Sequence, residues 1–154
     1  MEISTLKPRQ DLGQDTKISK AYLQYETLLK ELSKRKLPEH VVASINKDVE
    51  ALNAMPEDGK LLAQELKSRQ ARLVRSLEKE LKLVPKAYYR NIWLGLGMAS
   101  FGIPIGVAFG LTSGNMAFLG IGLPLGLGIG SAVGTAMDKK ALAEGRQLDL
   151  EIKS

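Results

Sequence analysis

The residue types that carry most enzyme chemistry are scarce in this sequence of 154 residues. Cysteine is absent, which excludes a thiolate nucleophile, a thiolate zinc site and a disulfide framework. His40 is the only histidine, and it follows Pro38-Glu39, where a helix is expected to begin, so we interpret it as a surface residue. Glu78 and Glu80 fall on different faces of an expected helix and cannot act as a carboxylate pair. The sequence therefore predicts no enzyme and no catalytic, cofactor-binding or metal-binding residues.

The most regular spacing in the chain belongs to glycine, and twelve of its fifteen glycines lie in residues 91–137. A four-residue step keeps a position nearly on one face of a helix. Within a bilayer, stripes of small residues allow helices to approach closely and to associate through dispersion forces. We expect eight glycines in two such series to pack one helix on another: Gly102, Gly106, Gly110 and Gly114, and Gly122, Gly126, Gly130 and Gly134.

The two glycine series are parts of an internal repeat, because residues 102–110 align with residues 122–130 at a constant offset. The join between them, Ser113-Gly114-Asn115, has the composition of a turn. Two apolar helices joined so tightly must form an antiparallel hairpin, which is a duplication in inverted topology. Folding about this turn sets the following residues opposite each other: Gly106 and Gly122, Gly102 and Gly126, and Gly110 and Phe118.

A second stripe of small residues is displaced by two positions from the first, which turns it about 200° away on each helix. It contains Pro104, Ala108, Gly120, Pro124, Gly128 and Ala132. We expect this stripe to mediate self-association into a ring or cluster; the alternative is a monomeric hairpin whose extra glycines face lipid. Paired prolines can mark a transport site in inverted repeats. Because the apolar segment has no ionisable side chain, kinks that assist packing are the favoured interpretation.

The glycine series lie in a stretch that no charge interrupts, since residues 91–137 contain no Asp, Glu, Lys or Arg. Residues 92–112 and 116–137 are each long enough to cross a hydrocarbon core of about 30 Å as a helix. Basic residues flank both segments and none lies at the turn, which predicts that both termini are cytoplasmic. The alternative is a buried hairpin in a soluble protein, but the rest of the chain is too small to cover both helices.

The charged remainder of the chain is expected to be helical as well. Residues 1–15 are polar and are interpreted as a flexible tail. Apolar residues recur at helical spacing in residues 16–36, 38–54 and 57–84, which predicts a cytoplasmic three-helix bundle or coiled-coil domain over residues 16–84. The expected order is completed by a juxtamembrane linker over 85–91, the transmembrane hairpin over 92–137 and a cytoplasmic tail over 138–154. The predicted fold class is all-α.

Basic side chains gather just before the apolar segment, where residues 60–90 carry nine basic and three acidic residues. We expect a stripe of them to meet anionic lipid headgroups, each contributing about 1 kcal/mol near the surface. The stripe consists of Arg72, Arg75, Lys79, Lys82, Lys86 and Arg90. A solvated helix face is an equally good interpretation. Nucleic acid is not an expected partner, because the stripe lacks aromatic residues on which bases could stack.

The two glycine series around Ser113-Gly114-Asn115 resemble those of bacterial glycine-zipper membrane proteins, over about residues 91–140. The resemblance implies residence in the bacterial inner membrane and close helix packing, and it implies no activity. Amphipathic helices beside a hairpin with two small-residue faces lead us to expect a small multi-pass scaffold or anchor. Its expected partners are the lipid bilayer, further copies of itself and a cytoplasmic protein. The alternative function is an oligomeric pore or a membrane-disrupting effector.

Overall fold

The computed structural model describes residues 2–9, 16–56 and 59–152, and it is mostly helical. The chain divides into two compact units. The first contains residues up to Leu83 together with those from Leu148 onward, and the second contains Val84–Gln147. Each unit has its own packing and is described separately.

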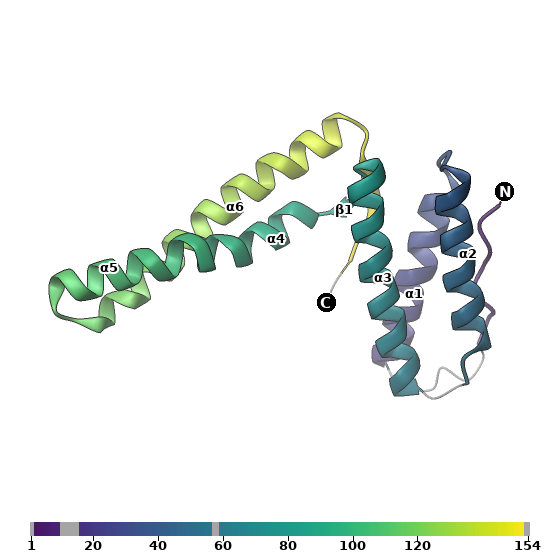
Figure 1. Ribbon diagram of the computed structural model, residues 1–154, viewed down its shortest axis with the longest axis horizontal. Coiled ribbons are helices and arrows are strands. Elements are labelled where there is room, and N and C mark those ends of the chain that lie inside the picture. The colour runs from purple at the N-terminus through teal and green to yellow at the C-terminus, as the bar shows by residue number, and fades with distance from the viewer. Residues whose placement is uncertain (1, 10–15, 57–58, 153–154) are drawn as a thin grey trace. The chain divides into compact units, whose positions relative to one another are not determined.

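The first unit contains α1 (Thr16–Ser33), α2 (Glu39–Ala54) and α3 (Gly59–Leu81), which lie side by side in Figure 1. Helix α3 packs against both α1 and α2. The buried residues follow the apolar spacing of the sequence, since each helix turns one stripe inward. The largest fully buried side chains of the three helices are Tyr25, Leu28, Leu32, Ile45, Val49, Leu52, Leu66 and Leu77.

The ends of these helices follow from local backbone chemistry. Pro38 occupies the N-cap of α2 in an extended conformation, so it precedes the first helical turn. Helix α3 ends at Leu81, three residues earlier than the apolar pattern predicts, because Lys82 adopts a left-handed conformation with φ 57°. The sequence offers Asp15 or Thr16 as the N-cap of the first helix. The structure begins α1 at Thr16, and Asp15 lies outside the described residues.

Residues 2–9 differ from the flexible tail that the sequence predicts. They form no helix or strand, yet Leu6 is buried and the backbone bonds to side chains of α2. Asparagine side chains of α2 hold the backbone of this segment, and such contacts leave no apolar pattern in the sequence.

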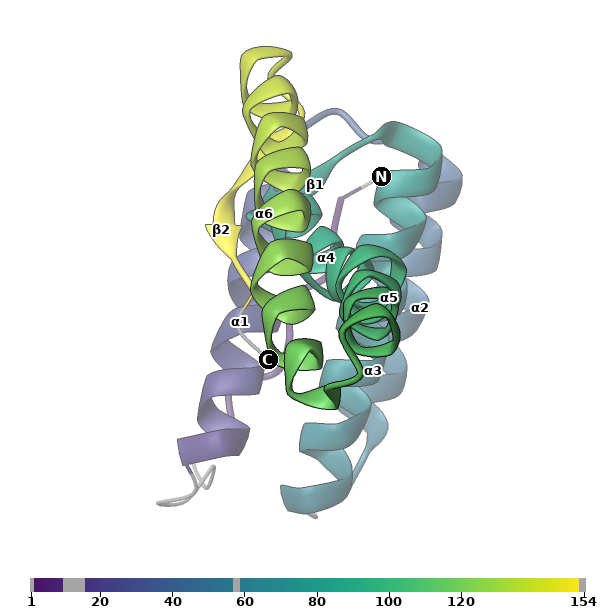
Figure 2. The same ribbon diagram turned by 90° about the vertical axis from the view of Figure 1, so that its left-hand side faces the viewer.

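The second unit is an antiparallel pair of helices, drawn in green and yellow in Figures 1 and 2. Its first arm is a continuous helix made of α4 (Tyr88–Gly97), the π-helical turn η1 (Met98–Gly102) and α5 (Ile103–Ser113). A 3-10 turn, η2 (Met116–Phe118), leads into the second arm, α6 (Leu119–Ala143). All three segments of the first arm pack on α6.

The boundaries of the helical pair correct two predicted segments. The linker expected over 85–91 instead contains part of β1 (Val84–Lys86) and the first residues of α4. The C-terminal tail expected over 138–154 instead continues α6 and then forms β2 (Gln147–Glu151), with Leu148 and Leu150 buried. Strands β1 and β2 pair in a two-stranded sheet. Strand β1 is too short to show a pattern, whereas polar and apolar residues alternate along the five residues of β2.

Candidate functional site: the glycine-lined hairpin

The interface between the two arms of the hairpin is lined by glycine. Four buried glycines come from each arm: Gly97, Gly102, Gly106 and Gly110, and Gly122, Gly126, Gly130 and Gly134. The stripe on α6 has an unbroken four-residue step, and it faces the first arm along its whole length. At seven of these eight glycines the nearest atoms across the interface are backbone, and at Gly110 the nearest is the sulfur of Met116.

The closeness of the backbones is measured by placing a β-carbon on each glycine. A β-carbon on Gly122 would lie 2.7 Å from the Cα of Gly106, and one on Gly126 would lie 2.7 Å from the Cα of Gly102. Both distances are well inside van der Waals contact, and the obstructing atoms are backbone, which cannot rotate away. The structure thus brings together Gly106 with Gly122 and Gly102 with Gly126, the pairs set opposite each other by the predicted turn.

Gly97 belongs to the interface although the four-residue spacing of the sequence does not include it. A β-carbon on Gly97 would lie 2.8 Å from the Cα of Gly130. Five residues separate Gly97 from Gly102, and this step would rotate Gly97 off the shared face of a regular α-helix. The intervening turn η1 is π-helical, with the N–H of Ile103 donating to the carbonyl of Met98, and its wider turn restores the alignment.

Gly114 does not pack between the helices, which corrects its predicted place in the first glycine series. It is exposed, has φ 66°, and a β-carbon on it would meet nothing within 4 Å. Its N–H donates to the carbonyl of Leu111 and the next N–H donates to the carbonyl of Gly110, which is a Schellman cap at the end of α5. Gly110, whose carbonyl accepts one bond of this cap, lies nearest to Met116. Folding about the predicted turn had instead set Phe118 opposite Gly110.

The turn is completed by Asn115, whose side-chain Oδ1 accepts the N–H of Ala117 at 2.9 Å. This bond caps the 3-10 turn η2 and fixes the direction in which the chain re-enters the second arm. Turn formation accounts for both the glycine and the asparagine at the tip of the hairpin.

The second small-residue stripe lies on the outer surface of the hairpin. β-carbons on Gly120 or Gly128 would meet nothing within 4 Å, so these glycines do not contribute to the packing of the two arms. All six residues expected in the stripe are exposed: Pro104, Ala108, Gly120, Pro124, Gly128 and Ala132. Pro104 is the second residue of α5, one residue beyond the end of η1, and its missing N–H lies where the π-helical turn already departs from the regular bonding pattern.

Asp138 closes the base of the hairpin, a role that sequence reasoning missed. The residue is 8% exposed, and its carboxylate accepts two backbone N–H groups, that of Tyr89 at Oδ1 and that of Arg90 at Oδ2, both at 3.0 Å. The N-cap residue of α4, Ala87, supplies no side-chain acceptor. Asp138 on α6 therefore satisfies two free N–H groups at the start of α4, where a negative charge also complements the helix dipole. The available signal was that Asp138 is the first charge after the uncharged stretch.

Further polar and aromatic contacts surround this base. Tyr88 and Tyr89 pack edge to face with ring centroids 5.3 Å apart. Hydrogen bonds from the Arg146 guanidinium to Glu144, and secondarily to Tyr89, raise the pKa of Arg146 above its usual value. Helix α6 ends beside this group in a second Schellman cap, in which Gly145 has φ 68° and the N–H of Arg146 donates to the carbonyl of Ala141.

The six basic residues expected at lipid headgroups are all exposed. Arg72, Arg75 and Lys79 lie on α3, whereas Lys82 follows the end of that helix and forms an ion pair with Glu78 at 3.7 Å. Lys86 lies in β1 and Arg90 in the first turn of α4, so the six do not form one continuous helical stripe.

His40 lies at the surface, and its Nε2 is 2.9 Å from Oε2 of Glu80. Hydrogen bonds from His40, and to a lesser degree from Ser76, lower the pKa of the Glu80 carboxyl. This pair joins α2 to α3.

Two long apolar helices are the feature of this chain that bears on function. Helical residues Tyr88–Ser113 and Met116–Ala143 number 26 and 28, and both segments are long and apolar enough to cross a membrane. Comparisons of the chain with protein-family models, curated proteins and solved structures find no match.

Proposed function

We propose that this chain is a two-span membrane anchor of the bacterial inner membrane, which self-associates through its hairpin and presents a helical interaction domain in the cytoplasm. At about 1.5 Å per residue the two helical segments are roughly 40 Å long, which exceeds a hydrocarbon core of about 30 Å. Both arms could therefore cross the bilayer and still reach the headgroups at each side.

The observation that carries this proposal is the exposed apolar surface of the hairpin. In the most apolar window of each segment, 17% of the residues are buried, whereas a core helix of a soluble protein is mostly covered. Leu111 is 70% exposed, and Phe109 and Ile121 are about half exposed. Glycines occupy the inside of the hairpin and large apolar side chains its outside, which is the arrangement that suits lipid as the surrounding solvent.

The proposed orientation follows from charge. Lys86 and Arg90 precede the first span, Lys139 and Lys140 follow the second, and residues 113–115 at the turn carry no charge. Basic flanks are retained on the cytoplasmic side. Trp93 and the Tyr88–Tyr89 pair would then lie at the cytoplasmic headgroups, where aromatic rings are enriched.

Self-association is supported by the outward stripe of small residues, because such stripes allow two helices to approach closely in lipid. In this arrangement the three helices α1 to α3 form a cytoplasmic bundle that recruits a protein partner, while Arg72, Arg75 and Lys79 face anionic headgroups. The open sites at Gly120 and Gly128 are the positions where a neighbouring backbone could come nearest.

Membrane topology can be tested with single cysteines, because the natural sequence has none. Ser113→Cys at the turn should react with a membrane-impermeant maleimide added outside intact spheroplasts. Lys36→Cys, between α1 and α2, should react only after lysis. Release of the protein by alkaline carbonate, or labelling of Lys36→Cys from outside, would refute the proposed anchor.

Self-association can be tested by the mass of the detergent-solubilised protein. We expect an oligomer for the natural chain and a smaller species for Gly128→Leu, while Ile129→Leu serves as a control on the same helix. A monomer for the natural chain would contradict the proposal. Conductance in planar bilayers would favour the alternative function of a pore.

A further inference from the structure

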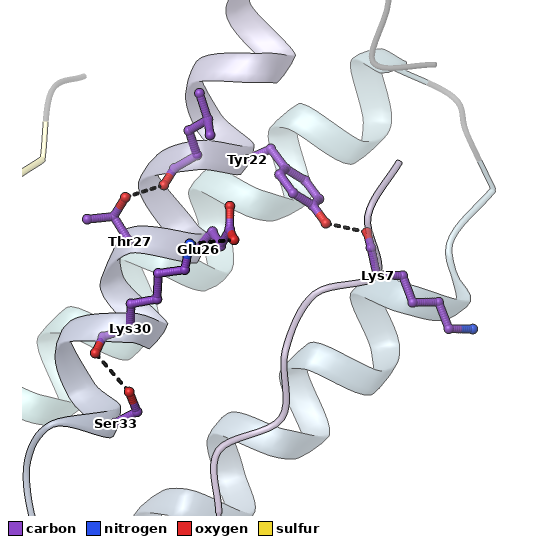
Figure 3. A network of polar contacts seen from close by, with 7 residues as sticks. Lys7, Tyr22, Glu26, Thr27, Lys30 and Ser33 are labelled. Atoms are coloured by element: carbon purple, nitrogen blue, oxygen red, sulfur yellow. Dashed lines mark hydrogen bonds and ion pairs between the residues drawn. The ribbon is translucent and has the colours of Figure 1, made fainter. Parts of the chain in front are cut away.

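The N-terminal segment, residues 2–9, is held on the first unit as a bound peptide would be. It runs beside α2 in Figure 1 and passes close to Tyr22 of α1 in Figure 3, where the Tyr22 hydroxyl donates to the carbonyl of Lys7. Leu6 is buried, and its neighbours in the segment line a small cavity with Leu29 and Ser33 of α1.

Two asparagines of α2 bind the backbone of this segment. Oδ1 of Asn46 accepts the N–H of Ser4 at 2.7 Å, and its Nδ2 donates to the carbonyl of Glu2 at 2.9 Å. Asn53 repeats the arrangement with the N–H of Lys7 at 2.9 Å and the carbonyl of Thr5 at 3.3 Å. Each asparagine thus satisfies one donor and one acceptor of an extended chain, regardless of the side chains there.

The spacing of the asparagines matches that of the peptide. Asn46 and Asn53 are seven residues apart, which is about 10.5 Å along a helix. Ser4 and Lys7 are three residues apart, which is about 10 Å along an extended chain. A helix that carries asparagines at this interval presents a repeating recognition surface for extended backbone.

Two side chains of the segment add specificity. Leu6 fills an apolar position, and the Arg9 guanidinium donates from Nη2 to the carbonyls of Leu52 and Met55, both at 2.9 Å. These carbonyls lie at the C-terminal end of α2, where a positive charge complements the helix dipole. The surface therefore selects an extended peptide with leucine and, three residues later, arginine.

We propose that this face of α1 and α2 is a peptide-binding site, and that residues 2–9 of a second copy of the chain can occupy it in place of the chain's own segment. The segment is the one sequence known to fit, and every contact described above is the same whichever copy supplies it. Exchange of an identical element between copies creates no new contact and has a low free-energy cost.

The connection to α1 limits which copy can supply the segment. Residues 10–15 join Arg9 to Thr16, and a connection of this length spans on the order of 20 Å when fully extended. The donor must therefore be a neighbouring copy, and the proposed association of the hairpins would raise its effective concentration. The inference rests on that proposed function only for this proximity, because the binding contacts lie within the first unit.

The exchange can be tested with cysteines in two differently tagged full-length chains, one carrying Ser4→Cys and the other Ser33→Cys, because both positions line the same cavity. After the chains are mixed in nanodiscs and oxidised, a disulfide between the two tags is expected. The double variant Ser4→Cys/Ser33→Cys in a single chain reports docking within one copy. Ser4→Cys mixed with Lys67→Cys on α3 provides the negative control.

Arg9 of the donor segment distinguishes binding from collision. Arg9→Ala in the chain with Ser4→Cys should lower the yield between tags about tenfold, which is the effect of losing roughly 1.4 kcal/mol, because the incoming segment loses its bonds to the carbonyls of α2 while the acceptor's own segment keeps them. The proposal is overturned if disulfides form only within single chains, or if the yield between tags does not respond to Arg9→Ala in the donor. Introducing Gly128→Leu separates the two proposals, since exchange should persist at high protein concentration even where hairpin association fails.

Discussion

The carboxylate of Asp138 lies 3.0 Å from the backbone N–H of Arg90, so a side chain near the end of one long helix caps the beginning of the other. A helix usually receives such a cap from its own preceding residue, but Ala87 cannot supply one to α4. The cap therefore ties the two arms of the hairpin together at their base, and it complements the glycine interface that extends from there to the turn.

Loss of this cap is expected to weaken the hairpin. Asp138→Ala leaves two partly buried N–H groups without an acceptor, which should lower the free energy of unfolding by about 1–2 kcal/mol. Asp138→Asn retains an oxygen acceptor and should lower it less. Denaturation in mixed micelles, followed by circular dichroism, would measure both, and exposed Lys139→Ala is the matched control. Equal stability of the alanine variant and the control would contradict the capping role.

Substitution of glycine by alanine is expected to have opposite effects on the stability of the hairpin in the two glycine stripes of α6. Gly126→Ala places a methyl group 2.7 Å from the Cα of Gly102, so the helices must separate at a cost of about 1–3 kcal/mol. Gly128→Ala adds a methyl group in open space and should stabilise the helix by up to about 1 kcal/mol. The same micelle denaturation compares the two directly. Similar destabilisation by both variants would show that the inward and outward faces are wrongly identified.

The π-helical turn η1 should tolerate the deletion of one residue. Removal of Ala99, which is exposed, would place Gly97 four residues before Gly102 and allow a regular α-helix to keep both on the inner face. Removal of Ile129 from α6 cannot be compensated in this way, because it rotates the remainder of that regular helix by about 100°. The expected result is a folded, monodisperse protein for the first deletion and an unstable one for the second. An unstable protein after removal of Ala99 and a folded one after removal of Ile129 would exclude η1 as the element that keeps the two stripes in register.

Tyr25 is expected to make the first unit sensitive to alkali. Burial, and to a lesser degree the charge of Asp48, raises the pKa of its hydroxyl to about 12. An acid whose pKa is higher in the folded state contributes its full stability below the ordinary value of 10.0 and loses it as the pH rises from there towards 12. Tyr25→Phe should remove this component, which ultraviolet titration together with denaturation at pH 8 and pH 11 would reveal.

The same substitution should be tolerated at neutral pH. Within the described part of the chain, the Tyr25 hydroxyl is buried without a hydrogen-bond partner. Tyr25→Phe therefore removes an unsatisfied polar group and should be neutral or stabilising by about 1 kcal/mol. A clear destabilisation at pH 7 would indicate that the hydroxyl is bonded in solution.

Much of the fold of this molecule can be predicted from the spacing of its residues. The apolar stripes of α1, α2 and α3 follow a helical period, and the uncharged stretch with its four-residue glycine step predicts two long apolar helices. In both cases the pattern lies within a single segment, where periodicity is informative. Gly106 and Gly122 can be set opposite each other because a short turn fixes the fold-back.

The features that the sequence did not reveal depend on partners far along the chain. Gly97 joins the interface only because a π-helical turn absorbs its five-residue separation from Gly102, and nothing in the apolar composition requires that turn. Asp138 bonds to N–H groups 48 and 49 residues away, which exist in every sequence and leave no signature. The docking of residues 2–9 likewise depends on Asn46 and Asn53, whose polar character is equally compatible with an exposed helix surface.

The cap on α4 also has a consequence for the order of events during synthesis. The acceptor at Asp138 is translated 48 residues after the Arg90 N–H that it receives, so the first arm leaves the ribosome with that end unpaired. Water must satisfy these N–H groups until the second arm has been made. The base of the hairpin is thus closed late in synthesis, and a nascent chain that stops short of Asp138 is left with an open, hydrated base.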